Sequence, residues 1–108
     1  MEKLTSSFFV ETTSRKIIQV NGGLRKMFNL GTAENTLVGQ NSTCLLLSIS
    51  KNFLDIEKFG EFYSRSLDKR EKNDIQNIRI NEKTNASVSY FYNKLFSCHY
   101  WEFSFFSR

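Results

Sequence analysis

The chain has 108 residues, a mass of 12.7 kDa and a formal net charge of +4 at pH 7. Its hydrophobic share of 40% and charged share of 24% are those of an ordinary globular protein, which excludes a wholly disordered chain. No apolar run approaches the roughly 20 residues of a membrane span, and the N-terminus does not resemble a signal peptide. We therefore expect one cytoplasmic domain over residues 1–108, with its core at about 7–107.

The charged and metal-binding residues exclude several functions. Basic residues are dispersed along the chain, whereas nucleic-acid binders usually concentrate them on one face, so we expect no nucleic-acid partner. Two cysteines and one histidine cannot complete a four-ligand zinc site of the Cys/His type, so we expect no metal site. Nucleophilic catalysis would require Cys44 to reach His99, and nothing in the sequence indicates that contact. We therefore expect a domain without enzymatic activity.

The N-terminal part predicts two strands and a short helix. Residues 7–12 and 16–20 are short apolar segments separated by a polar turn, and the second is rich in β-branched residues. Asn21 suits a helix N-cap, because its side chain can accept a hydrogen bond from a free backbone N–H. Apolar residues at i, i+3 and i+4 then predict a short helix over 24–28.

The middle of the chain predicts one long helix. Residues 33–38 favour a helical turn, whereas the short apolar segment 43–47 fits a strand or a helix equally well. Between residues 56 and 67, apolar side chains recur at steps of three and four, which predicts an amphipathic helix with Asp55 as its N-cap. Its solvated face is expected to carry the carboxylates of Asp55, Glu57 and Glu61.

The C-terminal part predicts three strands. Apolar and polar residues alternate over 78–80, 88–92 and 101–105, and a polar turn occupies 81–85. Strands grouped in two blocks around helices indicate an α+β fold, in which helices cover one face of an antiparallel sheet.

Short motifs occur in an informative order along nearly the whole chain. They are Phe9-Val10-Glu11, Ile17–Asn21, Leu24–Leu30, Glu34–Gln40 and Trp101-Glu102-Phe103. They resemble the opening hairpin, the first helix, the "E-x-L-I-G" step and the closing "W-x-F/Y" strand of the PAS domain. This domain is the sensor module of histidine kinases and cyclic-dinucleotide enzymes. Asn29 stands where glycine is usual in the family.

The resemblance implies a five-stranded antiparallel sheet in the order 2-1-5-4-3 with short helices and one longer helix on one face. It also implies a sensory domain of a larger bacterial signal-transduction protein, with an output domain in the parent chain and a small molecule or a second copy of the domain as partner. Phe105-Phe106-Ser107 replaces the usual Asp-Ile-Thr of the family exit. Either this contact is remodelled or the chain is a piece of a longer protein.

Two readings of the core follow. The first is a ligand pocket between a helical wall and a sheet wall, with Tyr63 and Tyr90 as polar handles. The candidate pocket residues are Leu24, Phe28, Phe59, Tyr63, Ile78, Tyr90, Trp101 and Phe103. The second is a core filled by these large rings, in a module that serves homodimerisation through an outer face. The candidate interface residues are Phe91, Tyr100 and Phe106.

The sequence gives little support for the flavin or haem cofactors that some members of the family bind. Photoreceptor members place a flavin-reactive cysteine directly after Gly-x-Asn, where this chain has Ser42 after Gly39-Gln40-Asn41. Cys44 comes two residues later, about 200° around a helix, so we expect no flavin photoadduct and interpret Cys44 as a small buried residue. Haem-bearing members use a histidine on the long helix, and the only histidine, His99, falls in the last strand. We expect no haem, and the identity of any ligand stays open.

Overall fold

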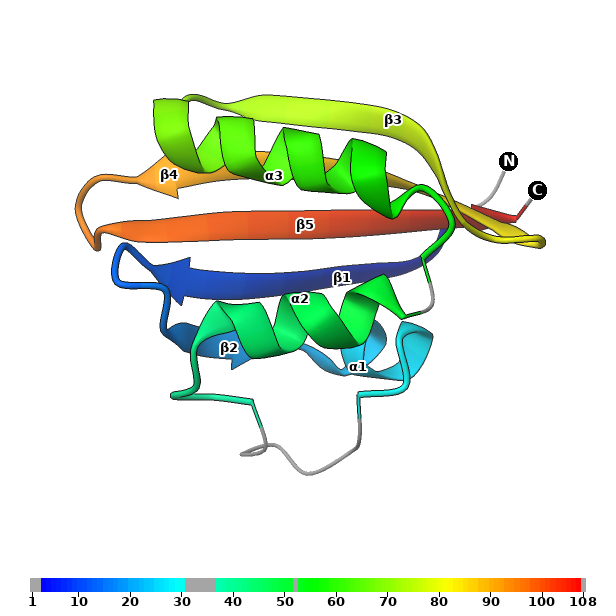
Figure 1. Cartoon of the computed structure of the whole chain (residues 1–108), viewed down its shortest axis with the longest axis horizontal. Coiled ribbons are helices and arrows are strands. Elements are labelled where there is room, and N and C mark those ends of the chain that lie inside the picture. The colour runs from blue at the N-terminus through cyan, green and yellow to red at the C-terminus, as the bar shows by residue number, and fades with distance from the viewer. Residues whose placement is uncertain (1–2, 31–36, 52, 108) are drawn as a thin grey trace.

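The computed structural model describes residues 3–30, 37–51 and 53–107. Its elements are β1 (Lys3–Thr12), β2 (Ile17–Val20), α1 (Gly22–Met27), α2 (Ser42–Ser50), α3 (Ile56–Lys69), β3 (Asn73–Asn81), β4 (Thr84–Asn93) and β5 (Cys98–Ser107). The strands form one antiparallel sheet in the order β2-β1-β5-β4-β3, and the helices lie together on one face of it (Figure 1). The predicted α+β fold and strand order are confirmed.

The short helix α1 is flanked by two asparagines, with Asn21 as its N-cap and Asn29 directly after its C-cap residue Phe28. Asn21 Oδ1 accepts hydrogen bonds from the backbone N–H groups of Leu24 (3.1 Å) and Phe8 (3.0 Å), which confirms the predicted N-cap and ties the helix to β1. Asn29 has a positive φ of 54°, the left-handed conformation that glycine usually supplies after a helix. Asparagine tolerates this conformation, so it can stand in the place of the family glycine.

The ambiguous segment 43–47 is helical and forms part of α2. Its buried residues Ser42, Leu45 and Ile49 are spaced as one helical stripe that packs toward the sheet. Cys44 is exposed, so the prediction that it is a buried residue is wrong. The reason is its position about 200° around the helix from the buried Ser42. Most of the helical turn predicted at 33–38 lies outside the described residues.

The long helix α3 is confirmed with Asp55 at its N-cap position, but the prediction that the Asp55 side chain is solvated is wrong. Asp55 occupies the N-cap position without a side-chain capping bond, and it is buried instead of solvated. Its carboxylate accepts hydrogen bonds from the backbone N–H of Arg79 (2.7 Å) and from the Arg79 guanidinium (2.8 Å). Strand β3 runs beside the start of the helix and therefore offers better donors than the helix itself. Glu57 and Glu61 are exposed, as expected.

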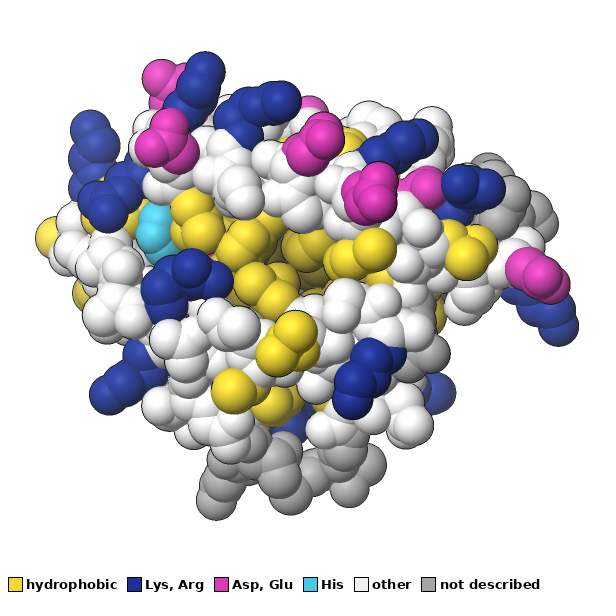
Figure 2. Space-filling model, viewed as in Figure 1, with side chains coloured by type: hydrophobic (Ala, Val, Ile, Leu, Met, Phe, Trp, Pro, Cys, Tyr) yellow, Lys and Arg dark blue, Asp and Glu magenta, His cyan; other side chains and the backbone are white. Residues whose placement is uncertain are grey.

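The C-terminal strands β4 and β5 place alternate side chains under the helices, many of them large. β4 and β5 pair in unbroken register from Thr84 opposite Ser107 to Asn93 opposite Cys98. The inward positions of β5 are fully buried, and they hold Trp101, Phe103 and Phe105. Figure 2 shows hydrophobic side chains along the hollow between α2 and α3, while Lys, Arg, Asp and Glu gather over α3. None of the described helices is long and apolar enough to cross a lipid bilayer.

Candidate functional site

All the residues predicted to line a pocket are buried in one core. They are Leu24, Phe28, Phe59, Tyr63, Ile78, Tyr90, Trp101 and Phe103. The helical and sheet walls touch directly, because the ring centroids of Tyr63 and Trp101 lie 4.5 Å apart and those of Phe59 and Phe103 lie 5.6 Å apart. Tyr90 also packs on Trp101 at 4.4 Å. The rings predicted to face one another across a cavity are therefore in contact at these places.

A fully buried carboxylate lies at one end of this core. Glu11, near the end of β1, has no solvent-exposed surface. Its Oε1 accepts hydrogen bonds from Ser42 Oγ (2.7 Å) and Arg15 Nε (3.0 Å), and its Oε2 accepts from the Tyr63 hydroxyl (2.6 Å) and Trp101 Nε1 (2.9 Å). These five residues are called the Glu11 cluster below. One carboxylate thereby joins β1 to the β1–β2 turn, to α2, to α3 and to β5.

The chemistry of the Glu11 cluster explains how a carboxylate can be buried there. An isolated buried charge is very costly, and hydrogen bonds together with a cation offset that cost. Arg15 supplies the cation from the β1–β2 turn, where its backbone has a positive φ of 69° and its side chain remains 35% exposed. Burial, and next the charge of Glu11, raise the pKa of Tyr63 well above its usual range. Tyr63 therefore keeps its proton and acts as a donor.

Sequence reasoning missed Glu11 as a site residue. Alternation along β1 places Glu11 on the same face as Phe9, which would have indicated an inward carboxylate. No local pattern indicates three of its four partners, because Ser42, Tyr63 and Trp101 are 31, 52 and 90 positions away.

His99 lies next to the Glu11 cluster in a second buried polar contact. His99 Nδ1 and the Tyr90 hydroxyl share a hydrogen bond of 2.7 Å. Burial lowers the pKa of His99 and raises the pKa of Tyr90 to about 12, so both groups are neutral at neutral pH.

Cys44 lies exposed on α2, and the described residues contain no group of three His, Cys, Asp or Glu side chains placed to hold a metal ion.

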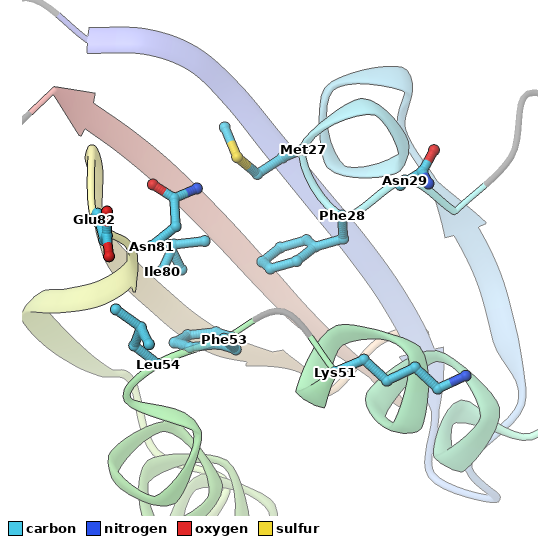
Figure 3. Close-up of a pocket in the computed structure, with 9 residues that line it drawn as sticks. All are labelled: Met27, Phe28, Asn29, Lys51, Phe53, Leu54, Ile80, Asn81 and Glu82. Atoms are coloured by element: carbon cyan, nitrogen blue, oxygen red, sulfur yellow. The ribbon is translucent and has the colours of Figure 1, made fainter.

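A pocket of about 590 Å³ lies at the other end of the core, between the end of α1, the α2–α3 connection and the β3–β4 turn (Figure 3). Phe28, Phe53 and Ile80 form its buried apolar floor, and the rings of Phe28 and Phe53 stack at 5.8 Å. Asn81 and Glu82 supply polar groups from the β3–β4 side. Among the predicted pocket residues, Phe28 alone lines this pocket.

The face of the sheet opposite the helices carries two of the three predicted interface residues side by side. The rings of Phe91 and Tyr100 stack at 4.6 Å with an interplanar angle of 10°, and Phe91 is 47% exposed. Together with Phe8 and their neighbours they line a hollow of about 390 Å³. Phe106 lies on the same face of β5, six positions farther along, and is not among the residues that line this hollow.

The sheet order and the helices on one face are those of the PAS fold. Similar solved structures are a domain of an HTR-like protein from Haloarcula marismortui (TM-score 0.59, 14% identity, 94% of this chain and 96% of that chain) and the PAS domain of histidine kinase ThkA (0.56, 13%, 94% and 98%). A third is a sensory box sensor histidine kinase from Vibrio cholerae (0.57, 9%, 97% and 82%). No protein-family model and no curated protein matches the chain. At these identities the likeness establishes the fold, and the chain has the PAS fold.

Proposed function

We propose that the chain is a cytoplasmic regulatory domain of a larger bacterial signal-transduction protein, and that it passes its signal through protein contacts without catalysis of its own. A histidine kinase or cyclase output would lie elsewhere in the parent protein. The PAS fold supports a signalling role, because the similar structures include histidine kinases. The observation that carries the contact role is the stacked aromatic pair on the outer face of the sheet, in which Phe91 is exposed and Tyr100 is partly buried.

The outer face suits a second copy of the same domain. Contiguous exposed apolar surface commonly marks an interface, and aromatic residues are enriched at the centres of interfaces. A two-fold dimer brings the same patch of each copy together, so Phe91 and Tyr100 of one copy would pack on those of the other. Tyr100 directly precedes Trp101, a member of the Glu11 cluster, so this face is joined through β5 to the helices. A change in how the two copies associate would thereby favour one arrangement of helices and sheet over another.

The oligomeric state tests this proposal. Light scattering over a concentration series is expected to show a mass approaching twice 12.7 kDa for the wild type. Phe91→Glu places a charge in the interface and is expected to hold the domain as a monomer. Leu47→Glu is the matched control, because Leu47 is exposed on α2 on the other side of the molecule. A wild type that stays monomeric at every concentration would contradict the dimer.

The pocket beside Phe28 and Phe53 favours a second candidate function, the binding of a small apolar molecule with a polar end. Its volume of about 590 Å³ lies within the range of small-molecule sites. Native mass spectrometry and thermal shifts with a metabolite set would detect such a ligand. Leu54→Trp, at the rim of the pocket, is expected to abolish the shift caused by a true pocket ligand. A ligand whose shift survives this substitution binds elsewhere.

A further inference from the structure

The donors of the Glu11 cluster have the geometry of a carboxylate receptor. An ionised carboxylate offers about four lone-pair sites, and here each oxygen accepts from two side-chain donors at 2.6 to 3.0 Å. The set holds a guanidinium, two hydroxyls and an indole N–H, and it has one cation for one carboxylate. Donors of this kind bind a free carboxylate as well as a tethered one.

Other contacts hold these donors in place independently of Glu11. Trp101 is fully buried and packs between Tyr63 and Tyr90, at centroid distances of 4.5 and 4.4 Å. The backbone N–H of Ser42 donates to the carbonyl oxygen of Arg15 at 2.7 Å, which fixes the start of α2 against the β1–β2 turn. The Arg15 guanidinium also donates to the Tyr63 hydroxyl at 3.1 Å. The donors are therefore preorganised, and a preorganised site loses less entropy when it binds.

We propose that Arg15, Ser42, Tyr63 and Trp101 form a binding site for a small monocarboxylate, which the chain fills with the side chain of its own Glu11. The tethered carboxylate has a high effective concentration, so it excludes free carboxylates from the wild-type site. The occupant also has a structural role, because it fastens α2 and α3 to the sheet. This inference goes beyond the proposed function and does not depend on whether the domain dimerises.

Glu11→Ala empties the site in a defined way. The substitution removes a methylene group and the carboxylate, and acetate consists of a methyl group and a carboxylate. Acetate is therefore the probe that matches the space left behind. Two buried donors, the Tyr63 hydroxyl and the Trp101 indole N–H, lose their shared acceptor oxygen in this variant, and binding of acetate would restore it.

The test is the thermal midpoint in sodium acetate against sodium chloride at equal ionic strength and neutral pH. The midpoint of Glu11→Ala is expected to rise with acetate and to gain about 5 °C at ten times the dissociation constant. The control is Glu61→Ala, which removes an exposed carboxylate from α3. The wild type and this control are each expected to have the same thermal midpoint in the two salts. Glu11→Gln keeps the volume of the side chain and leaves no space for acetate, so its midpoint is expected to be the same in the two salts. It loses the negative charge that pairs with Arg15, so it is expected to melt lower than the wild type.

The indole N–H signal of Trp101 in an NMR spectrum gives a second readout at the site. In Glu11→Ala this signal is expected to shift saturably with acetate, and the added substitution Arg15→Met is expected to abolish the shift. If Glu11→Ala is unfolded in chloride, the expected result is recovery of the folded spectrum in acetate. A Glu11→Ala protein that ignores acetate, whether folded or unfolded, overturns the proposal. An equal response of the wild type also overturns it, because acetate would then act elsewhere.

Discussion

The two ends of the interface between helices and sheet use different chemistry. At one end the Glu11 cluster holds α2 and α3 to the sheet by directional hydrogen bonds to one carboxylate. At the other end Phe28, Phe53 and Phe59 pack as stacked rings at 5.4 to 5.8 Å beside the pocket. Hydrogen bonds with several partners fix one arrangement, whereas apolar packing tolerates rearrangement when volume is kept. We therefore expect motion of the helices, and the proposed binding of a small apolar molecule, at the apolar end.

The largest expected loss of stability comes from a substitution at the apolar end. Phe53→Ala leaves a cavity between Phe28 and Phe59 and is expected to lower the free energy of unfolding by about 3 to 5 kcal/mol. Phe53→Leu conserves most of the volume and is expected to cost less than about 1.5 kcal/mol. Urea denaturation measures both. Equal losses of unfolding free energy in the two variants would show that this end depends on ring geometry. That result would contradict the view that apolar packing here tolerates rearrangement.

The next largest loss of stability is expected at the polar end, from a substitution that removes one oxygen atom. Tyr63→Phe keeps the ring but removes a donor to Glu11, and it is expected to lower the free energy of unfolding by about 1 to 3 kcal/mol. Tyr92→Phe is the matched control, because among the described residues the Tyr92 hydroxyl accepts only a long 3.4 Å hydrogen bond from Arg70 in an exposed place. The same denaturation assay serves for both variants. If they lose the same stability, the Glu11 cluster does not fasten the helices.

Acid is expected to weaken the apolar end through Asp55. The hydrogen bond from the Arg79 side chain, and next that from the Arg79 backbone, lower the pKa of Asp55 to about 2. Because the folded pKa lies below the unfolded value of 3.8, the contribution is complete above about pH 4 and is lost as the pH falls toward 2. We expect a loss of about 1 kcal/mol, reduced by the exposure of Arg79. Asp55→Asn should flatten this part of a stability curve measured against pH, and an unchanged curve would contradict the assignment.

The smallest effect concerns His99 at the polar end. Burial lowers its pKa in the folded state, so the unfolded chain takes up the proton first as the pH falls through about 6.5. Stability is therefore expected to decline below about pH 7, with a slope below about 1.4 kcal/mol per pH unit for this one group. His99→Gln should remove the slope. Hydrogen exchange measured at pH 7 and pH 5.5 should find the loss near Tyr90 and His99 and not near Phe53.

Local patterns were sufficient to predict much of the fold. The steps of three and four in α3 and the alternation in β4 and β5 are visible over a few residues, and the structure confirms these elements. The motif order also predicted the sheet order. The pattern failed where a neighbouring strand competes for a side chain: Asp55 carries the sequence signal of an N-cap, yet β3 offers it Arg79.

The sequence by itself determined most of the helices and strands, with α2 as the exception, because these depend on side-chain periodicity and on residues that start or end a helix. It also determined that large rings from β4 and β5 face the helices. Only the tertiary structure decided that Glu11 is buried among donors up to 90 positions away, and that a pocket opens beside Phe28 between the end of α1 and the β3–β4 turn. The physical reason is that hydrogen-bond partners and packing volume depend on distances between elements, and periodicity along one element carries no information about those distances.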